Sequence, residues 1–379
     1  MKRKVILVLT VTLLLSQTAC STGKKSDDTS ETRSATQTEA AAVACICKPF
    51  DDLRPEDDSQ RILQEGEYKP EQIYTYTFND EVILKGSEDV QEELIEKGKN
   101  PGIGIRALQE KGYTGKGVNV AIIDQNLLLD HPEFKDKIAA YYDTGCEMPE
   151  DNGSMHGPAV TSILVGKDIG VAPDAKVYYA AVPTWKADSS YYAKALDWVV
   201  EQNAQLPADQ KIRVISISAD PSYSDIFANA QAYKEALQRT RDAGILVLDC
   251  SEEGYDGVSI APAYCDPEDK EDFTKCRGGF PNEPYQLSSN VIGAPCNYRT
   301  VAEEYVTGKA TYRYEGVGGL SWGIPLVAGT LAMGWQVDPS LSNDQAMKIL
   351  VDTCARAGDG SKIVNPTAFV EAVEKNKLS

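Results

Sequence analysis

Short apolar segments alternate with helical segments from Gly102 to the end of the chain, and this order constrains the fold more than any other feature. Residues 118–123 form a mostly apolar run, which is typical of a parallel strand covered on both faces. Similar runs follow at 176–182, 213–218 and 245–249, with helical patterns at 190–202 and 225–241. The alternation predicts an α/β fold with a doubly wound, mostly parallel sheet.

Local signals mark where some elements begin and end. Gly244 follows one helical pattern closely and is typical of a helix C-terminus. Ser342 and Gln345 fit a capping box at the start of another helix. Before the alternating region, residues 72–84 are predicted to be rich in strand and residues 90–97 to be helical.

The first 19 residues have the pattern of an export signal. A basic segment at 2–4 precedes an apolar stretch at 5–15 that is short for a membrane span, and Ala19-Cys20 follows. A cysteine in this place resembles the lipobox of bacterial lipoproteins, in which the thiol carries a diacylglycerol group. We expect a protein anchored to the extracellular face of the bacterial membrane through Cys20. The alternative is an ordinary signal peptide with an incidental cysteine.

The rest of the chain divides into three parts. Residues 20–44 are rich in Ser, Thr, Lys, Asp, Glu and Ala without apolar periodicity, which predicts a disordered tether. Residues 45–101 form a small N-terminal region whose role the sequence does not indicate. Residues 102–379 are long enough for one large domain with its own core.

The chain is strongly acidic. Its formal net charge is -19, which becomes -22 without the three basic residues of the export signal. Such a surface repels phosphate backbones, so we expect no nucleic-acid partner. Acidity that serves only to keep a surface protein soluble is the simpler interpretation of the charge.

Nine cysteines are present, and eight remain if Cys20 carries lipid. An even number in an exported protein is consistent with disulfides. Cys265 and Cys276 are the most plausible local pair, and the other pairings stay open. With only two histidines and no zinc-like Cys/His spacing, we expect no metal and no cofactor.

Three segments carry residue types with catalytic potential. Asp124 follows an apolar run, at the strand end where α/β sheets place active sites. His156, in GSMHG, begins a helical run and could act as a general base. Ser321, in GLSWGIP, precedes Pro325, which fits only the first turn of a helix, so a helix N-terminus would favour negative charge at Ser321. Taken alone, each has an ordinary interpretation as a turn former, a structural histidine or a helix cap.

Together the segments resemble the motifs of the subtilase family of serine peptidases. GYTGKGV, VAIID and HPEF resemble the family's Asp segment, HG and GVAP its His segment, and GLSWGIPLVAG its nucleophile segment. The chain order Asp, His, Ser is that of subtilisins. The resemblance covers about residues 102–373. It implies a subtilisin-like catalytic domain at 102–379 and a serine endopeptidase that hydrolyses a peptide or protein substrate through an acyl-enzyme, with the triad Asp124, His156 and Ser321.

Several positions depart from the family pattern. Gln125-Asn126 follow the aspartate, Pro158-Ala159 follow the histidine motif, and the short interval after His156 leaves no room for a calcium loop found in some relatives.

The most serious departure is Glu252, which stands where the family has an Asn that donates to the oxyanion. Loss of such a donor costs roughly 100- to 1000-fold in turnover, a figure that comes from a subtilisin. We expect the oxyanion region to include Ser321, Ser251 and Glu252, with Glu252 turned away or protonated, or with Ser251 or a backbone N–H in its place. The alternative function is a catalytically weak or inactive subtilase-fold lipoprotein that binds or senses.

The resemblance also implies where substrate binds. The strand that pairs with substrate contains Ser216 and Ser218, and Asp220 lies beside the primary specificity pocket, opposite Glu252. Two carboxylates there would favour cleavage after Lys or Arg. The alternative is that Asp220 only starts the turn at Pro221. The sequence indicates neither the physiological substrate nor the oligomeric state.

Overall fold

The computed structural model describes residues 47–55, 59–149 and 151–378. The export signal, Cys20 and the tether at 20–44 lie outside the described residues. Residues Ala44–Ser379 form one compact unit, which contains both the small N-terminal region and the predicted catalytic domain. In the described part of the chain, no helix is both long and apolar enough to cross a membrane.

The centre of the unit is a five-stranded parallel sheet in the order β4-β5-β3-β6-β7. The strands are β3 (Asn119–Asp124), β4 (Ile138–Asp143), β5 (Lys176–Ala181), β6 (Ile212–Ile217) and β7 (Leu246–Leu248). The chain adds β4 and β5 on one side of β3 and then β6 and β7 on the other. The carboxyl ends of β3 and β6 therefore flank the point where the winding reverses, which is where α/β sheets bind ligands. The predicted α/β fold is confirmed.

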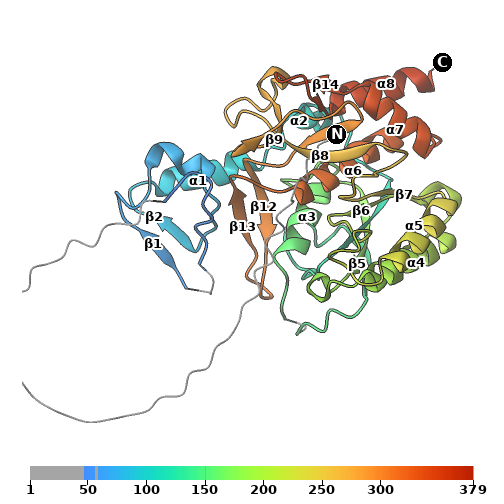
Figure 1. Cartoon of the computed structure of the whole chain (residues 1–379), viewed down its shortest axis with the longest axis horizontal. Coiled ribbons are helices and arrows are strands. Elements are labelled where there is room, and N and C mark those ends of the chain that lie inside the picture. Colours follow the sequence, from blue (N-terminus) through green and yellow to red (C-terminus); the bar gives the residue numbers. More distant parts are fainter. Residues whose placement is uncertain (1–46, 56–58, 150, 379) are drawn as a thin grey trace, which may run out of the picture. The chain divides into compact units, whose positions relative to one another are not determined.

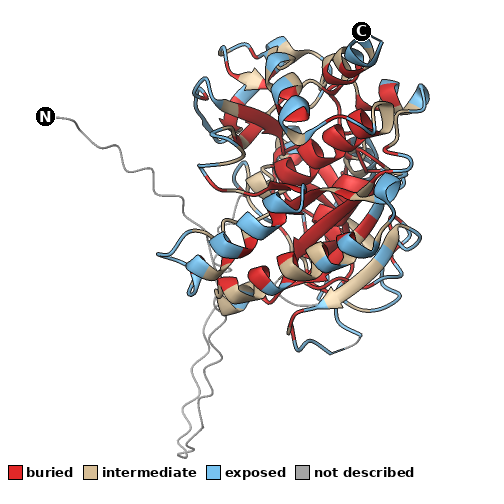
Figure 2. Cartoon of the chain, turned by 90° about the vertical axis from the view of Figure 1, so that its right-hand side faces the viewer, coloured by how far each residue is buried: buried red, intermediate tan, exposed pale blue. Residues whose placement is uncertain are grey.

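Two pairs of helices cover the two faces of this sheet (Figure 1). On one face, α4 (Ser189–Gln205) and α5 (Ala230–Asp242) pack on Ile123, Ile215 and Ile217. On the other face, α3 (His156–Val165) and α6 (Leu320–Val337) pack on Val120, Ile122 and Val214. Successive residues of a strand point to opposite faces, so apolar runs without alternation supply both cores. Figure 2 shows that burial is most complete along these central elements.

A second sheet has the order β10-β9-β8-β11-β15-β14. Its strands are β8 (Ser259–Tyr264), β9 (Arg277–Phe280), β10 (Glu283–Pro284), β11 (Val291–Pro295), β14 (Ala355–Arg356) and β15 (Lys362–Ile363). The loop between β8 and β9 is closed by the Cys265–Cys276 disulfide, which confirms that predicted pair. Among the described residues, free thiols are found at Cys146, Cys250, Cys296 and Cys354.

The remaining helices of the main domain are α2 (Ile105–Glu110), α7 (Asn343–Asp352) and α8 (Pro366–Lys377). The capping box of α7 is confirmed, because Ser342 accepts from the backbone of Gln345 and Gln345 accepts from the backbone of Ser342. Gly244 follows the end of α5 with φ of 77°, as its position in the sequence predicts.

The N-terminal region contains β1 (Arg61–Leu63), η1 (Pro70–Thr75), β2 (Val82–Leu84) and α1 (Glu88–Gly98). The predicted helix is confirmed, whereas the prediction of strand across 72–84 is right only for its last residues. Pro70 opens a 3-10 helix here, since its fixed φ suits a first helical position. Of the aromatic residues that suggested a strand, Tyr76 and Phe78 instead fill a separate small core, and Tyr74 is exposed.

This region packs on a hairpin formed by β12 (Arg299–Glu303) and β13 (Thr311–Glu315). The rings of Phe78 and Tyr314 stack with centroids 5.2 Å apart, and the two residues exchange backbone hydrogen bonds. Arg54 forms an ion pair with buried Glu303 of the hairpin. Because β13 leads directly into the segment that carries Ser321, the N-terminal region supports the approach to that segment.

Candidate active site

Asp124 is the last residue of β3 and is 4% exposed. Its Oδ1 accepts hydrogen bonds from the backbone N–H of Gln125, at 2.8 Å, and from Nδ1 of His156, at 2.6 Å. A carboxylate that accepts from Nδ1 holds the proton on that nitrogen and leaves Nε2 with its lone pair. Asp124 and His156 therefore have the relation that a general base and its orienting carboxylate need.

His156 is the first residue of α3, and a close backbone approach places it there. A Cβ on Gly157 would lie 2.5 Å from the carbonyl oxygen of Gln125 and 2.6 Å from the hydroxyl of Tyr179. Only glycine allows the start of α3 to come this close to the loop after Asp124. Pro158 follows at the third helical position, where a missing N–H breaks no helical hydrogen bond, so this departure from the family pattern leaves the helix intact.

Ser321 is the second residue of α6 and is half-buried. The ring of its neighbour Trp322 lies 5.1 Å from the ring of His156, centroid to centroid. The hydroxyl of Ser321 donates a long hydrogen bond, 3.4 Å, to the backbone oxygen of Ser218. The structure thus brings the start of α6 to His156 and places Ser321, the predicted nucleophile, at a helix N-terminus whose free N–H groups would favour an oxyanion.

Pro325 lies in the second turn of α6, as its sixth residue, which corrects the expectation of a first-turn proline. A proline here cannot donate to the carbonyl four residues earlier, which is that of Ser321. The hydroxyl of Ser218 donates to this carbonyl instead, at 2.8 Å. The carboxyl end of β6 therefore compensates for the proline and holds Ser321 through its backbone.

The oxyanion region differs from the family arrangement. Glu252 is exposed, and its side chain forms no hydrogen bond with another described residue. Of the alternatives that the sequence left open, the structure favours a Glu252 that points away. Ser251 is buried, and its hydroxyl donates to Asp249 and accepts from the N–H of Gly254. It is therefore engaged elsewhere, and the N–H of Ser321 remains as the donor that the fold provides.

The predicted substrate-binding residues have different environments. Ser216 is 1% exposed and lies on the face of β6 that packs under α6, so it is not placed to touch a substrate. Ser218 is half-buried at the site, as described above. Asp220 accepts from the N–H and hydroxyl of Ser222, which is the arrangement of a turn-forming aspartate. The structure therefore supports the turn-forming interpretation of Asp220.

Two features of the site were missed by sequence reasoning. Asp249, at the end of β7, is 8% exposed and accepts a 2.7 Å hydrogen bond from the hydroxyl of Tyr233. Burial raises its pKa, against the hydrogen bonds that Ser251 and Tyr233 donate. The second is the packing of Trp322 on His156. A carboxylate directly after an apolar strand was the available signal for Asp249, whereas nothing in the sequence indicated the ring contact.

The comparisons with known proteins agree with this geometry. Residues 115–251 match the model of the Subtilase family (Peptidase_S8), a segment that contains Asp124 and His156 and ends before Ser321. The chain is 23% identical over 276 residues to Subtilisin NAT from Bacillus subtilis subsp. natto, with 70% of this chain and 68% of that protein covered. It is 26% identical over 280 residues to Subtilisin BL from Lederbergia lenta, with 69% and 94% covered.

Solved structures share the fold. Fervidolysin from Fervidobacterium pennivorans, described as a keratinolytic enzyme related to subtilisin, aligns with a TM-score of 0.51 and 17% identity, over 73% of this chain and 47% of that one. A protease from Pseudoalteromonas arctica aligns with a TM-score of 0.51 and 19% identity, over 76% and 98%. The family match and the similarity to subtilisins support membership of the subtilase family of serine endopeptidases, and the solved structures show a shared fold.

Proposed function

We propose that this chain is an extracellular, lipid-anchored serine endopeptidase that cleaves peptide bonds with Ser321, His156 and Asp124. The observation that carries the proposal is the 2.6 Å hydrogen bond between Nδ1 of His156 and Asp124, made beside the helix N-terminus that holds Ser321. Nucleophile, base and orienting carboxylate then come from the starts of two helices and the end of a strand on which both helices pack.

In the proposed reaction, Nε2 of His156 takes the proton of Ser321 as its Oγ attacks the substrate carbonyl. The hydroxyl must first turn from the carbonyl of Ser218, and a bond as long as 3.4 Å offers little resistance to that rotation. The imidazolium that forms is stabilised by buried Asp124 and returns its proton to the leaving amine. Water then hydrolyses the acyl-enzyme by the same route.

A fluorophosphonate probe tests this assignment, because it labels only a serine that is activated as a nucleophile. We expect the parent protein to be labelled and Ser321→Ala to be neither labelled nor active on peptides. Ser340→Ala, which removes an exposed hydroxyl, is the matched control and should be labelled like the parent. Peptide hydrolysis by Ser321→Ala at the parent rate would refute the role of Ser321.

A second candidate function rests on the oxyanion region. Glu252 is exposed and Ser251 is bonded to Asp249, so neither side chain takes the place of the family's amide donor. A subtilase fold with little turnover could serve as a lipoprotein that binds or senses peptides. Such a protein would resist the fluorophosphonate probe while still binding peptide, so the same experiment separates the two candidates.

The membrane anchor is a separate part of the proposal and rests on the sequence alone. The basic residues at 2–4, the apolar stretch at 5–15 and Ala19-Cys20 support attachment of lipid to Cys20. Mass spectrometry of membrane extracts should find a mature chain that begins at lipid-modified Cys20. Cys20→Ala should release the protein or block its processing. An unmodified Cys20 in protein from the culture medium would contradict the anchor and leave the peptidase assignment untouched.

A further inference from the structure

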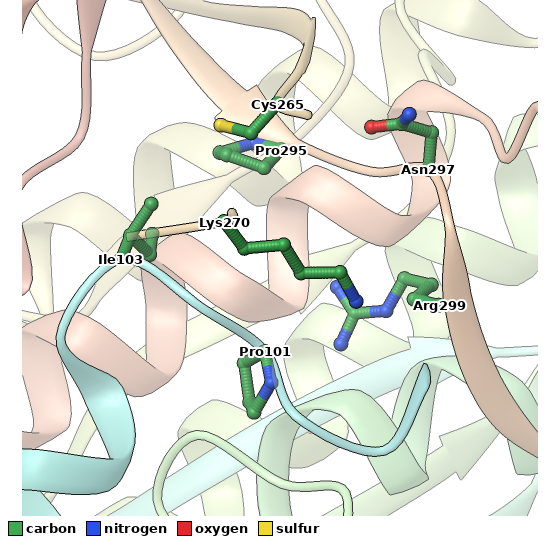
Figure 3. A pocket seen from close by; sticks show the side chains of 7 residues that line it. All are labelled: Pro101, Ile103, Cys265, Lys270, Pro295, Asn297 and Arg299. Carbon is green, nitrogen blue, oxygen red and sulfur yellow. The ribbon is translucent and has the colours of Figure 1, made fainter. Parts of the chain in front are cut away.

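A small cavity lies between three segments that are far apart in the chain, and none of the proposed catalytic residues lines it (Figure 3). The first segment is the connection from α1 to α2, which contributes Pro101. The second is the loop closed by the Cys265–Cys276 disulfide, which contributes Lys270. The third leads from β11 into β12 and contributes Asn297 and Arg299.

Two cations meet in this cavity. Figure 3 shows the charged ends of Lys270 and Arg299 pointing toward one another. Nζ of Lys270 donates to the backbone oxygens of Tyr298, at 2.6 Å, and Asn100, at 3.2 Å. Arg299 is 4% exposed. Two like charges held together away from water are costly unless an opposite charge accompanies them.

The described part of the chain supplies no carboxylate in an ion pair with Lys270 or Arg299. The two carboxylates whose charge acts on these cations, Glu271 and Glu315, are bonded to other groups. Glu271 accepts from the N–H of Gly104 at 2.6 Å. Glu315 forms an ion pair with Arg313 at 2.6 Å. The positive charge of the cavity is therefore compensated only in part, and by carboxylates that are bonded to other groups.

Two buried hydrogen-bond donors of the cavity residues also lack an acceptor. Nε of Arg299 and Nδ2 of Asn297 are buried without a hydrogen-bond partner among the described residues, although both residues are more than nine-tenths buried. Buried donors in folded proteins nearly always have an acceptor. Water could accept from one of them but would bring no charge. An anion supplies both the acceptor and the charge.

The lowered pKa values of Lys270 and Arg299 are consistent with a missing negative charge in the cavity. Burial, and then the charge of Arg299, lower the pKa of Lys270 to about 7, against a small opposing effect of Glu271. Burial likewise lowers the pKa of Arg299 to about 10, opposed by Cys296 and Glu315. A negative charge between the two groups would raise both pKa values toward their ordinary range.

The size of the cavity selects the ligand. The cavity has a volume of about 10 Å³, which is roughly what one water molecule needs. A single-atom anion fits with a slight movement of the side chains, whereas a phosphate or a carboxylate does not. We propose that Lys270 and Arg299 form a binding site for one small monatomic anion, chloride being the common one. The bound anion would stabilise the contact between the connection from α1 to α2, the loop closed by the Cys265–Cys276 disulfide, and the start of β12.

Thermal unfolding of the mature Ser321→Ala protein, which cannot digest itself, tests the site. Chloride is titrated at constant ionic strength against gluconate, which is too large for the cavity. We expect Tm to rise with chloride and then to follow the logarithm of its concentration above the Kd, because the anion binds only the folded protein. Equal Tm values in chloride and gluconate would overturn the proposal.

Variants show where the chloride acts. Lys270→Met removes one cation and should abolish the chloride-dependent rise in Tm. Lys275→Met is the matched control: Lys275 lies in the same loop but pairs with Asp269 at the surface, so its loss should leave the chloride response intact. A full response in Lys270→Met, or its loss only in Lys275→Met, would overturn the site.

Crystals grown in bromide give a test that needs no variant. We expect an anomalous peak between Lys270 and Arg299 in the parent fold. Water alone, or an oxyanion at this position in place of bromide, would contradict the proposal. Because the unfolding and diffraction measurements do not use peptidase activity, failure here and failure of the proposed function are distinguishable.

Discussion

Asp124 and Glu252 show how single residues preserve or alter the chemistry of this site. Asp124 is buried and bonded to His156, as an orienting carboxylate must be. Glu252 faces solvent, where an amide donor of the oxyanion hole is expected from the family. In the proposed site, the hydrogen bond that proton transfer needs is therefore present, while neither Glu252 nor Ser251 supplies the family's side-chain donor to an oxyanion.

Asp124→Asn should leave the fold unchanged and lower kcat by about four orders of magnitude. An amide in place of the carboxylate favours the wrong imidazole tautomer and cannot stabilise the imidazolium, and the same change in another serine peptidase has an effect of about 10⁴. Steady-state kinetics on a peptide substrate measure the effect, with Tm as the check on folding. A loss of less than tenfold with unchanged Tm would show that His156 does not depend on Asp124.

Glu252→Asn should raise kcat with little change in KM. The amide would restore a donor that acts mainly on the tetrahedral intermediate, where removing such a donor from a subtilisin costs about 100- to 1000-fold. Glu253→Asn removes a neighbouring exposed charge without placing an amide at the family's position, so it controls for charge alone. Equal gains in the two variants would mean that charge, and not the oxyanion donor, limits turnover.

Helices and strands act on the site through their ends. The carboxyl end of β6 meets the start of α6, where the hydroxyl of Ser218 donates to the carbonyl of Ser321 that Pro325 leaves without its helical partner. A side chain on a strand thus substitutes for a backbone N–H in a helix. The position of Ser321, the proposed nucleophile, depends on this hydrogen bond from Ser218.

Ser218→Ala should destabilise the protein by about 1–3 kcal/mol, because it leaves the carbonyl of Ser321 unsatisfied. In a Pro325→Ala background, the restored N–H can bond that carbonyl, so Ser218→Ala should cost less there. Urea unfolding of the two single variants and the double variant, all carrying Ser321→Ala, measures the coupling. Additive free energies would show that Ser218 does not compensate for Pro325.

Four of the five strands of the main sheet could be predicted from sequence to within one or two residues at most of their ends, whereas β4 was missed because its residues are mostly only half-buried. Strands buried on both faces leave continuous apolar runs, as at β3, and the capping box of α7 is a purely local signal. Predictions failed where tertiary contacts determine the local structure or the environment of a side chain. The aromatic residues of 72–84 alternate as in a strand, but Tyr76 and Phe78 fill a small core beside a 3-10 helix while Tyr74 is exposed. The face of β6 that carries Ser216 depends on α6, about 100 residues later in the chain.

At the scale of the whole molecule, buried charge joins the N-terminal region to the catalytic domain. Glu303 accepts from Arg313 at 2.9 Å and from Arg54 at 3.2 Å, and Asn79 donates to its other oxygen at 2.8 Å. Arg54 and Asn79 belong to the N-terminal region, and Arg313 belongs to the hairpin. The region is therefore held as a part of the folded unit, beside the segment that leads to Ser321.

Replacement of Glu303 tests how firmly this junction holds. Glu303→Ala should destabilise the Ser321→Ala protein by about 3–5 kcal/mol, since it leaves fully buried Arg313 with only part of its compensating charge. Asp197→Ala, which breaks the exposed pair with Arg239, is the control and should cost less than about 1 kcal/mol. Similar losses in both variants would show that burial does not strengthen the Glu303 junction.

The pH dependence of the stability lost in Glu303→Ala shows whether the charge of Glu303 is the source of that stability. Burial alone would raise the pKa of Glu303, but the charges of Arg313 and Arg54 and the hydrogen bond from Asn79 lower it below the ordinary value of 4.5. A depressed folded pKa contributes stability that is complete above the unfolded value and is lost as pH falls through the folded value. The difference in unfolding free energy between the parent and Glu303→Ala should therefore be constant from pH 7 to about 5 and shrink below pH 4.5. A difference that stays constant down to pH 3 would assign the effect to lost packing and not to the ion pairs.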